Sequence, residues 1–350
     1  MLLNRFKIYF HNRLVVNTLN TIVLRGAARG IGSLVPFFIA AWFGVTKITD
    51  VFFFVYGIVI FFNNSFATVL ENFIVPFIAE SRSKNQEKTS FFIGDVLIAS
   101  ALIIISILFV SLFLLKPIGN LFVHFNQESL NLFLVLFIEI VPLMVLIVLS
   151  SVLSGALNAY SLFKMPAISP AGRSIITLVI IYVYKDRFGI HSVILGYFLG
   201  ELFRTAILYH AARSAQLVQF NFRRMPISQI RDFFKTIAFR SSGVLAVAFN
   251  PLIDKSMVSW LGGGSITLVD YADKIYSIPV ILIVEGFLVV MISHWSHIHY
   301  DTDSKLKLKK ESQKTCKAIF WVSIFLSSIL FLSRRYLVHF IYGGRKISFE

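Results

Sequence analysis

The chain of 350 residues is poor in cysteine and in charged side chains, and it lacks the usual nucleotide and metal signatures. Cys316 is its only cysteine, which excludes an intramolecular disulfide and a cysteine metal cluster. It contains no G-x-x-x-x-G-K-[ST] loop and no H-E-x-x-H motif, and its histidines lack ligand spacing. These absences argue against an enzyme, and we expect neither a bound metal nor a cofactor.

Charge is scarce and apolar residues dominate. Only 15% of the residues are charged and 57% are hydrophobic, with a mean hydropathy of +0.77. Soluble domains are about 25% charged, so this composition is typical of a membrane protein. The apolar runs extend for about 20 to 30 residues, enough for helices to cross a hydrocarbon core of about 30 Å. The short alternating segments of a membrane β-barrel do not occur in the sequence. An all-α polytopic membrane protein is therefore expected.

The apolar runs, separated by charged gaps, predict about nine transmembrane helices. The predicted spans are 18–43, 49–79, 90–115, 130–157, 167–184, 189–212, 236–261, 266–297 and 315–333.

The basic residues indicate how these spans are oriented. The N-terminal M-L-L-N-R-F-K is basic and is not followed by a short apolar region with a cleavage site, so it predicts a cytoplasmic lead-in. More than twice as many Lys and Arg lie in the N-terminus and the even-numbered gaps as on the opposite side. The positive-inside rule then places the N-terminus in the cytoplasm of a bacterial inner membrane protein. This distribution explains the net charge of +15 without a nucleic-acid partner.

Two stretches suggest an internal repeat. W-F-G-V-T-K-I-T-D (42–50) and W-L-G-G-G-S-I-T-L-V-D (260–270) both place Trp and Gly after one span and Asp at the start of the next. An even number of spans separates them, which predicts a parallel repeat about an axis along the membrane normal. The repeat predicts a six-helix lobe over 1–212, a basic cytoplasmic linker over 213–235, and an incomplete second lobe of about three helices over 236–350.

Several further stretches carry a resemblance to a known family. They are G-V-T-K-I-T-D-V-F-F (44–53), I-V-P-F-I-A-E (74–80), S-G-A-L-N-A-Y-S-L-F-K-M-P-A-I-S-P (154–170), V-D-Y-A-D-K-I-Y-S-I-P (269–279) and I-Y-G-G-R-K-I-S-F (341–349). In this order they resemble the lipid II flippase family (MurJ/MviN type) of the multidrug/oligosaccharidyl-lipid/polysaccharide exporter superfamily.

The resemblance implies a two-lobe transporter with a cationic central cavity. Its substrate and partner would be a polyprenyl-pyrophosphate-linked saccharide, lipid II or another cell-envelope glycan precursor, moved to the outer leaflet. Two alternatives stay open. One is a multidrug or cation antiporter of the same superfamily. The other is an inactive truncated member, or one that needs a second polypeptide for the missing helices.

The resemblance also implies candidate substrate-binding residues. Arg29 matches an arginine of the first helix, Asp50 the acidic start of the second, and Asp273-Lys274 an Asp-Arg pair of the eighth. Two positions depart from the family: Asn63-Asn64 stands where paired arginines are usual, and Ser277 where a glutamate is usual. These departures leave open which glycan is carried.

The residues themselves give a physical reason for this choice. Arg25 and Arg29 lie one helical turn apart in an apolar span, where two arginines would cost about 5 to 7 kcal/mol. Arg25 can snorkel to the cytoplasmic surface, whereas the deeper Arg29 can grip pyrophosphate oxygens bidentately. Lys274 either lies in the cavity with Arg29 or neutralises a charge on a neighbouring helix. The adjacent Asp273 is not expected to pair with it directly.

Other charged residues fall at predicted membrane depth. Glu201 and Arg204 have the spacing of an intrahelical pair. Isolated side chains are expected to face the bundle interior, and any of them could hold a proton or cation. These are Glu71, Glu139, Arg173, Arg240 and Glu285, and Asp254-Lys255 in the seventh span resembles Asp273-Lys274. We predict ion coupling at Glu71, Glu139, Asp254 or Glu285, driven by H⁺, Na⁺ or the membrane potential.

Overall fold

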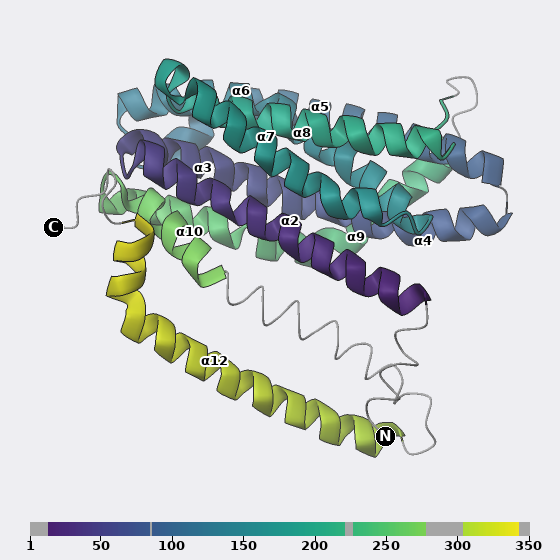
Figure 1. The fold of residues 1–350 in the computed structure, drawn as a ribbon. Helices are drawn as coiled ribbons and strands as arrows, with labels where there is room; N and C mark the ends of the chain where they lie inside the picture. Colours follow the sequence, from purple (N-terminus) through teal and green to yellow (C-terminus); the bar gives the residue numbers. More distant parts are fainter. Residues whose placement is uncertain (1–12, 85, 221–226, 278–303, 343–350) are drawn as a thin grey trace.

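The computed structural model describes residues 13–84, 86–220, 227–277 and 304–342 (Figure 1). Every regular element in these ranges is helical. Eight of the described helical stretches are long and apolar enough to cross a membrane. The predicted all-α polytopic membrane fold is confirmed.

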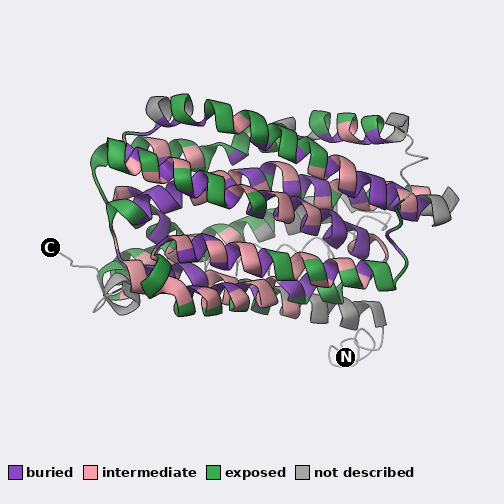
Figure 2. Ribbon diagram, turned by 90° about the horizontal axis from the view of Figure 1, so that it is seen from above, coloured by how far each residue is buried: buried purple, intermediate pink, exposed green. Residues whose placement is uncertain are grey.

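The helices between Arg13 and Ser214 form one bundle, which we call the N-terminal bundle. Its elements are α2 (Arg13–Phe43), α3 (Lys47–Phe62), η1 (Asn63–Ala67), α4 (Thr68–Lys84), α5 (Gln86–Phe122), α6 (Gln127–Ala159), α7 (Lys164–Phe188) and α8 (His191–Ser214). α7 packs along α8 and α2, while α6 lies against α4, α5 and α8. Figure 2 shows buried positions turned toward neighbouring helices and exposed positions on the outer faces.

Small residues let these helices approach closely. A Cβ atom at Gly155 on α6 would lie 2.4 Å from Cγ2 of Ile74 and 2.7 Å from the carbonyl oxygen of Glu71 on α4. One at Gly200 on α8 would lie 2.6 Å from the carbonyl oxygen of Arg173 on α7. Since lipid tails are as apolar as the helices, close packing of this kind is what holds a membrane bundle together.

The second predicted span, 49–79, is a single apolar stretch with an irregular middle. α3 passes into the π-helical turn η1 and then into α4, which contains Pro76. The π turn begins at Asn63, whose side-chain amide donates to Asn64 Oδ1 at 3.4 Å. A π turn inserts an extra residue into the helix and changes which side chains face the neighbours.

The seventh predicted span, 236–261, is broken in two. α9 (Ile227–Ala248) ends before Phe249, and α10 (Asn250–Val258) continues into the short turn η2 (Ser259–Leu261). Pro251, in the first turn of α10, has no N–H to continue the ladder from α9. α9 contacts η1 and α4, and α10 contacts α3, so this segment lies against the second span.

The last described parts are the helical residues 265–277 and α12 (Ser304–Tyr342). The predicted span 266–297 lies outside the described residues after 277. The span 315–333 falls within α12, whose contacts with the described elements are mainly with α2. Its aromatic side chains Phe320, Trp321 and Phe325 are exposed, as expected for a helix in contact with lipid.

Candidate functional site

The two repeat-like stretches contact each other at one end of the molecule, the predicted outer end. The Asp50 carboxylate, in the first turn of α3, accepts hydrogen bonds from the N–H of Gly264 and, at 2.8 Å, from the N–H of Thr267. It also accepts from the Thr267 hydroxyl at 2.7 Å. Tyr271 donates to the carbonyl oxygen of Gly44 at 3.1 Å. A carboxylate at the first turn of helix 265–277 is favourable because the N–H groups there lack helical partners.

Local sequence explains how these turns meet. Thr46 caps α3 and exchanges hydrogen bonds with Thr49, which holds Asp50 at the start of that helix. Gly264 has a φ of +95°, which side chains with a Cβ rarely adopt, and a Cβ there would lie 2.7 Å from Val45 Cγ1. Glycine is therefore required where the two turns touch.

A second contact lies deeper, where α10 and residues 265–277 meet α3. Lys255 is buried; its ammonium lies 2.6 Å from Asp270 Oδ1 and donates to the carbonyl oxygen of Phe53 at 2.9 Å. Lys274 lies 3.9 Å from Asp270 Oδ2 and 3.5 Å from Asp273. Lys255 and Lys274 share the buried Asp270, and the exposed Asp273 is the acid nearer to Lys274. These four side chains together carry no net formal charge. The expectation that Asp273 and Lys274 do not pair is wrong, because the lysine stem can bend back over the turn.

A third cluster lies inside the N-terminal bundle. The fully buried Glu201 on α8 pairs with Arg173 on α7 at 3.1 Å and with Arg204 at 3.0 Å. Ser150 on α6 donates to the same carboxylate at 2.5 Å, and Arg204 donates to Ser150 at 3.2 Å. The predicted Glu201–Arg204 pair is confirmed. The expectation of an isolated Arg173 is wrong, because Arg173 reaches a carboxylate on the neighbouring helix. The cluster carries one excess positive charge.

Two tyrosines lie between the second and third clusters. The rings of Tyr56 on α3 and Tyr197 on α8 stack with centroids 4.9 Å apart, and their hydroxyl groups interact. The Tyr56 hydroxyl is within electrostatic range of both Arg173 and Lys274. One phenol therefore interacts with Arg173, from the cluster with an excess positive charge, and with Lys274, from the cluster that is neutral overall. Such an arrangement can bind an anion bidentately, with the phenol as an additional donor.

The other predicted site residues are distributed more widely. Arg25 and Arg29 lie on α2, but their side chains are outside what the structure describes, and Glu285 lies outside the described residues altogether. Asp254 is exposed, and it is the adjacent Lys255 that is buried. Two acids expected to be isolated have partners.

The partners of these two acids lie on neighbouring helices. Glu71 accepts from Ser154 at 2.8 Å and from Asn158 at 3.4 Å. Glu139 lies 2.8 Å from His191 Nδ1. The sequence analysis placed Asp270 in the repeat but did not name it as a site residue, although its spacing of four residues before Lys274 was a usable signal. For the pairing of Lys255 with Asp270 across a turn, no local signal exists.

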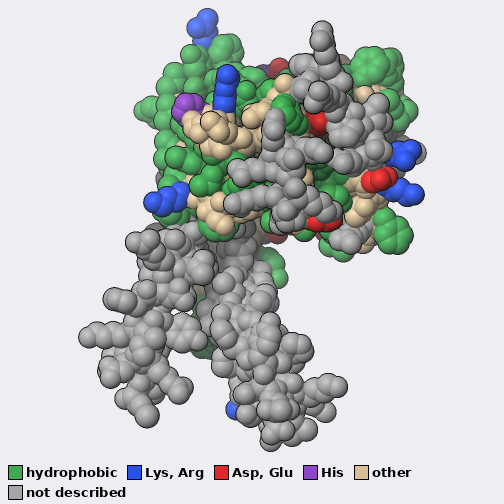
Figure 3. Space-filling model, turned by 90° about the vertical axis from the view of Figure 1, so that its right-hand side faces the viewer, with side chains coloured by type: hydrophobic (Ala, Val, Ile, Leu, Met, Phe, Trp, Pro, Cys, Tyr) green, Lys and Arg blue, Asp and Glu red, His purple; other side chains and the backbone are tan. Residues whose placement is uncertain are grey.

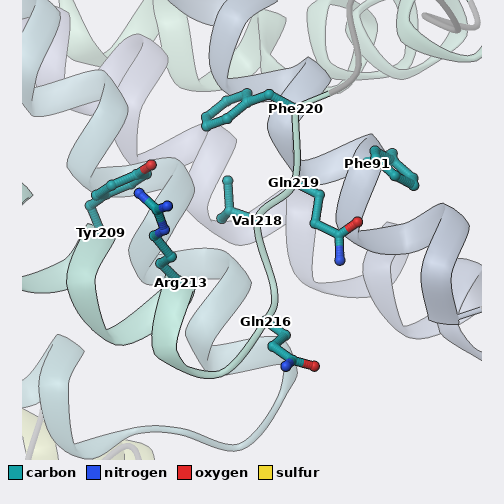
Figure 4. A pocket seen from close by; sticks show the side chains of 7 residues that line it. All are labelled: Phe91, Tyr209, Arg213, Gln216, Val218, Gln219 and Phe220. Atoms are coloured by element: carbon teal, nitrogen blue, oxygen red, sulfur yellow. The ribbon is translucent and has the colours of Figure 1, made fainter.

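Two surface cavities lie at opposite ends. One of about 630 Å³ at the predicted outer end is lined by Lys47, Asp50, His124 and Trp260, among others, and the His124 and Trp260 rings stack with centroids 4.6 Å apart. The other, of about 590 Å³, lies at the predicted cytoplasmic end of α8. Figure 4 shows its lining: Phe91, Tyr209, Arg213, Gln216, Val218, Gln219 and Phe220. Figure 3 faces that end and shows basic side chains at separate positions around it, not in one patch.

The chain is similar to known proteins over almost its whole length. The sequence profile described as "Lipid II flippase MurJ" matches residues 39–346. A "Probable lipid II flippase MurJ" of Borreliella burgdorferi is 23% identical over 345 residues, covering 95% of this chain and 66% of that protein. One of Buchnera aphidicola is 27% identical over 336 residues, covering 90% and 63%. The chain thus spans slightly less than two thirds of the length of these relatives.

Solved structures show the same fold. A lipid II flippase MurJ in an inward closed conformation superposes with a TM-score of 0.78 at 21% identity, over 94% of this chain and 68% of that one. An inward-facing multidrug resistance MATE transporter gives a TM-score of 0.69 at 15% identity, over 93% and 73%. The MurJ family that the sequence profile describes consists of flippases, which are transporters. This confirms the expectation of a protein that is not an enzyme. With its helical bundle, its turn-to-turn contact and a profile match over most of its length, the chain belongs to the MurJ family of lipid II flippases.

Proposed function

We propose that this chain flips a polyprenyl-pyrophosphate-linked saccharide from the cytoplasmic to the outer leaflet of a bacterial inner membrane, with its N-terminus in the cytoplasm. The observation that carries the proposal is the excess positive charge of the Arg173–Glu201–Arg204 cluster near Tyr56, with Lys274 in electrostatic range of the same phenol. Residues 1–212 would form the first lobe, 213–235 the linker and 236–350 the part of the second lobe present in this chain. Lipid II or another envelope glycan precursor would be the substrate.

The headgroup would bind between the lobes. Arg29 and Lys274 would contact the pyrophosphate, Arg25 would lie toward the cytoplasmic entrance, and Asp273 would orient Lys274. A guanidinium away from bulk water gains strength toward phosphate oxygens, while the polyprenyl tail can stay in the lipid.

The turn-to-turn contact supports an alternating-access mechanism. Asp50 links α3 to the helix 265–277 through Gly264 and Thr267, so in this conformation the outer end is closed. Release to the outer leaflet would require these bonds to break. Glu71, Glu139, Asp254 and Glu285 are the proposed ion-coupling residues, and H⁺, Na⁺ or the membrane potential would bias the two states.

The contacts of the buried acids disfavour a cation antiporter. A cationic drug needs an acidic group without a cationic partner, and in the two clusters near Tyr56 Glu201 is paired with two arginines and Asp270 with two lysines. An anionic headgroup is the better match to this balance of charge.

The test is mass spectrometry of the lipids that co-purify with the protein from its native membrane. We expect a polyprenyl-pyrophosphate saccharide with the wild type and its loss in Arg29→Ala. Arg231→Ala, at an exposed position on α9, is the matched control and should retain the lipid. If the wild type and Arg29→Ala both carry only bulk phospholipid, the proposal is wrong.

A further inference from the structure

We infer that Arg173 is a further headgroup-binding residue, which contacts the diphosphate of the lipid carrier from the side opposite Lys274. The inference rests on the proposed function and extends it to a residue of α7. It is carried by the position of Arg173, the charge of its cluster and the donors it leaves unused.

Arg173 lies on the inner face of α7. At 100° per residue it stands about 40° from the fully buried Thr177, about 160° from Ile175 and about 180° from Tyr182. Ile175 and Tyr182 are exposed on the outer surface of the bundle, with 50% and 65% of their surface accessible. The Arg173 side chain nevertheless remains 31% exposed. Because it points away from the lipid-facing side, this exposed part faces the interior of the molecule, toward Tyr56 and Tyr197.

Glu201 does not use up the charge of Arg173. The carboxylate is already paired with Arg204 at 3.0 Å, and Arg204 is more buried, with 11% of its side chain exposed. Among the described residues, the guanidinium of Arg173 donates through Nη1 to Glu201 alone. A guanidinium has five N–H donors, so those on Nη2 and Nε are available for a ligand. Glu201 therefore fixes the orientation of the Arg173 side chain without neutralising its charge.

Arg173 lies at a similar membrane depth to Arg29 on α2, the other arginine proposed to bind the headgroup. A Cβ at Gly32 would lie 3.4 Å from the hydroxyl of Ser174, the residue after Arg173. Further along the same two helices Trp42 and Tyr182 are in ring contact, so α2 and α7 run side by side in one direction. Arg29 precedes Gly32 by three residues, about 4.5 Å along the helix axis. The backbone positions of Arg29 and Arg173 thus lie at similar depth on adjacent helices.

The test compares three variants of the purified full chain. Binding of a polyprenyl diphosphate and of the matching polyprenyl monophosphate is measured by native mass spectrometry in detergent. Arg173→Gln should weaken diphosphate binding at least about tenfold, the effect of losing a charge-assisted contact. Arg173→Lys keeps the positive charge beside Glu201 but cannot bind phosphate oxygens bidentately as a guanidinium does. Its affinity for the diphosphate should therefore fall more than its affinity for the monophosphate. Arg231→Gln, at an exposed position on α9 outside these clusters, is the matched control and should bind like the wild type.

The outcomes separate the two proposals. Wild-type affinity in both Arg173 variants, beside a wild type that prefers the diphosphate, would overturn the inference and leave the proposed function standing. An equal loss in Arg231→Gln and Arg173→Gln would also overturn it, since the loss would then not be specific to Arg173. A wild type that does not prefer the diphosphate would refute the proposed function itself. Where Arg173→Gln does not fold, Arg173→Lys alone decides.

Discussion

At the scale of the residue, two buried acids of this protein each have two cationic partners. Glu201 and Asp270 are each shared by two cations, and each is almost wholly buried. Removing one partner from such a pair leaves an uncompensated charge, which costs far more than the intact pair contributes. At Glu201 the arrangement also leaves one excess positive charge, which could bind an anionic headgroup.

Lys255→Met should destabilise the protein by about 3 kcal/mol. The substitution leaves Asp270 without its 2.6 Å partner and the Phe53 carbonyl without its donor. Thermal unfolding in detergent measures the change. Asp254→Asn, at the exposed neighbouring position, is the control and should unfold at the wild-type temperature. A Lys255→Met protein as stable as the wild type would show that this pair does not hold α10 against α3.

At the scale of the element, close helix packing depends on a few glycines with no space for a methyl group. Gly155 brings α6 against α4 at the level where Glu71 meets Ser154. The apolar pattern of both helices predicted that they cross the membrane. It carried no information on which pair would approach closest, because nearly every position in them is apolar.

Gly155→Ala should destabilise the bundle by about 1 to 3 kcal/mol through overpacking against Ile74. Gly243→Ala on α9 is the matched control, since nothing lies within 4 Å of a Cβ there, and it should be neutral or slightly stabilising. Thermal unfolding of the two variants, purified identically, tests the difference. Equal melting temperatures would mean that α4 can shift away from α6 at no cost.

At the scale of the whole molecule, the orientation in the membrane follows from the basic residues of the loops. The rule predicts that the start of α12, rich in lysine, lies in the cytoplasm. The chain provides its own probe there, because Cys316 is its single cysteine and is exposed.

A membrane-impermeant maleimide should label Cys316 only after the cells are permeabilised. A cysteine introduced as Lys185→Cys in a Cys316→Ser background is the control, and it should be labelled in intact cells because the end of α7 is predicted to lie outside. Labelling of Cys316 in intact cells would reverse the topology, and with it the direction of transport proposed here.

The amino-acid sequence by itself determined the class of the protein and the number and approximate bounds of most of its helices. Long apolar runs have one stable form in a bilayer, since each backbone N–H and C=O needs a partner within the segment. It also marked Asp50, Lys274 and the Glu201–Arg204 pair. Only the tertiary structure decided which charges meet. Lys255 reaches Asp270 across a turn, Arg173 reaches Glu201 on another helix, and Asp50 reaches Gly264 and Thr267 from a distant part of the chain. Such partners are chosen by helix packing, and helix periodicity describes only which side chains share a face, not what lies opposite.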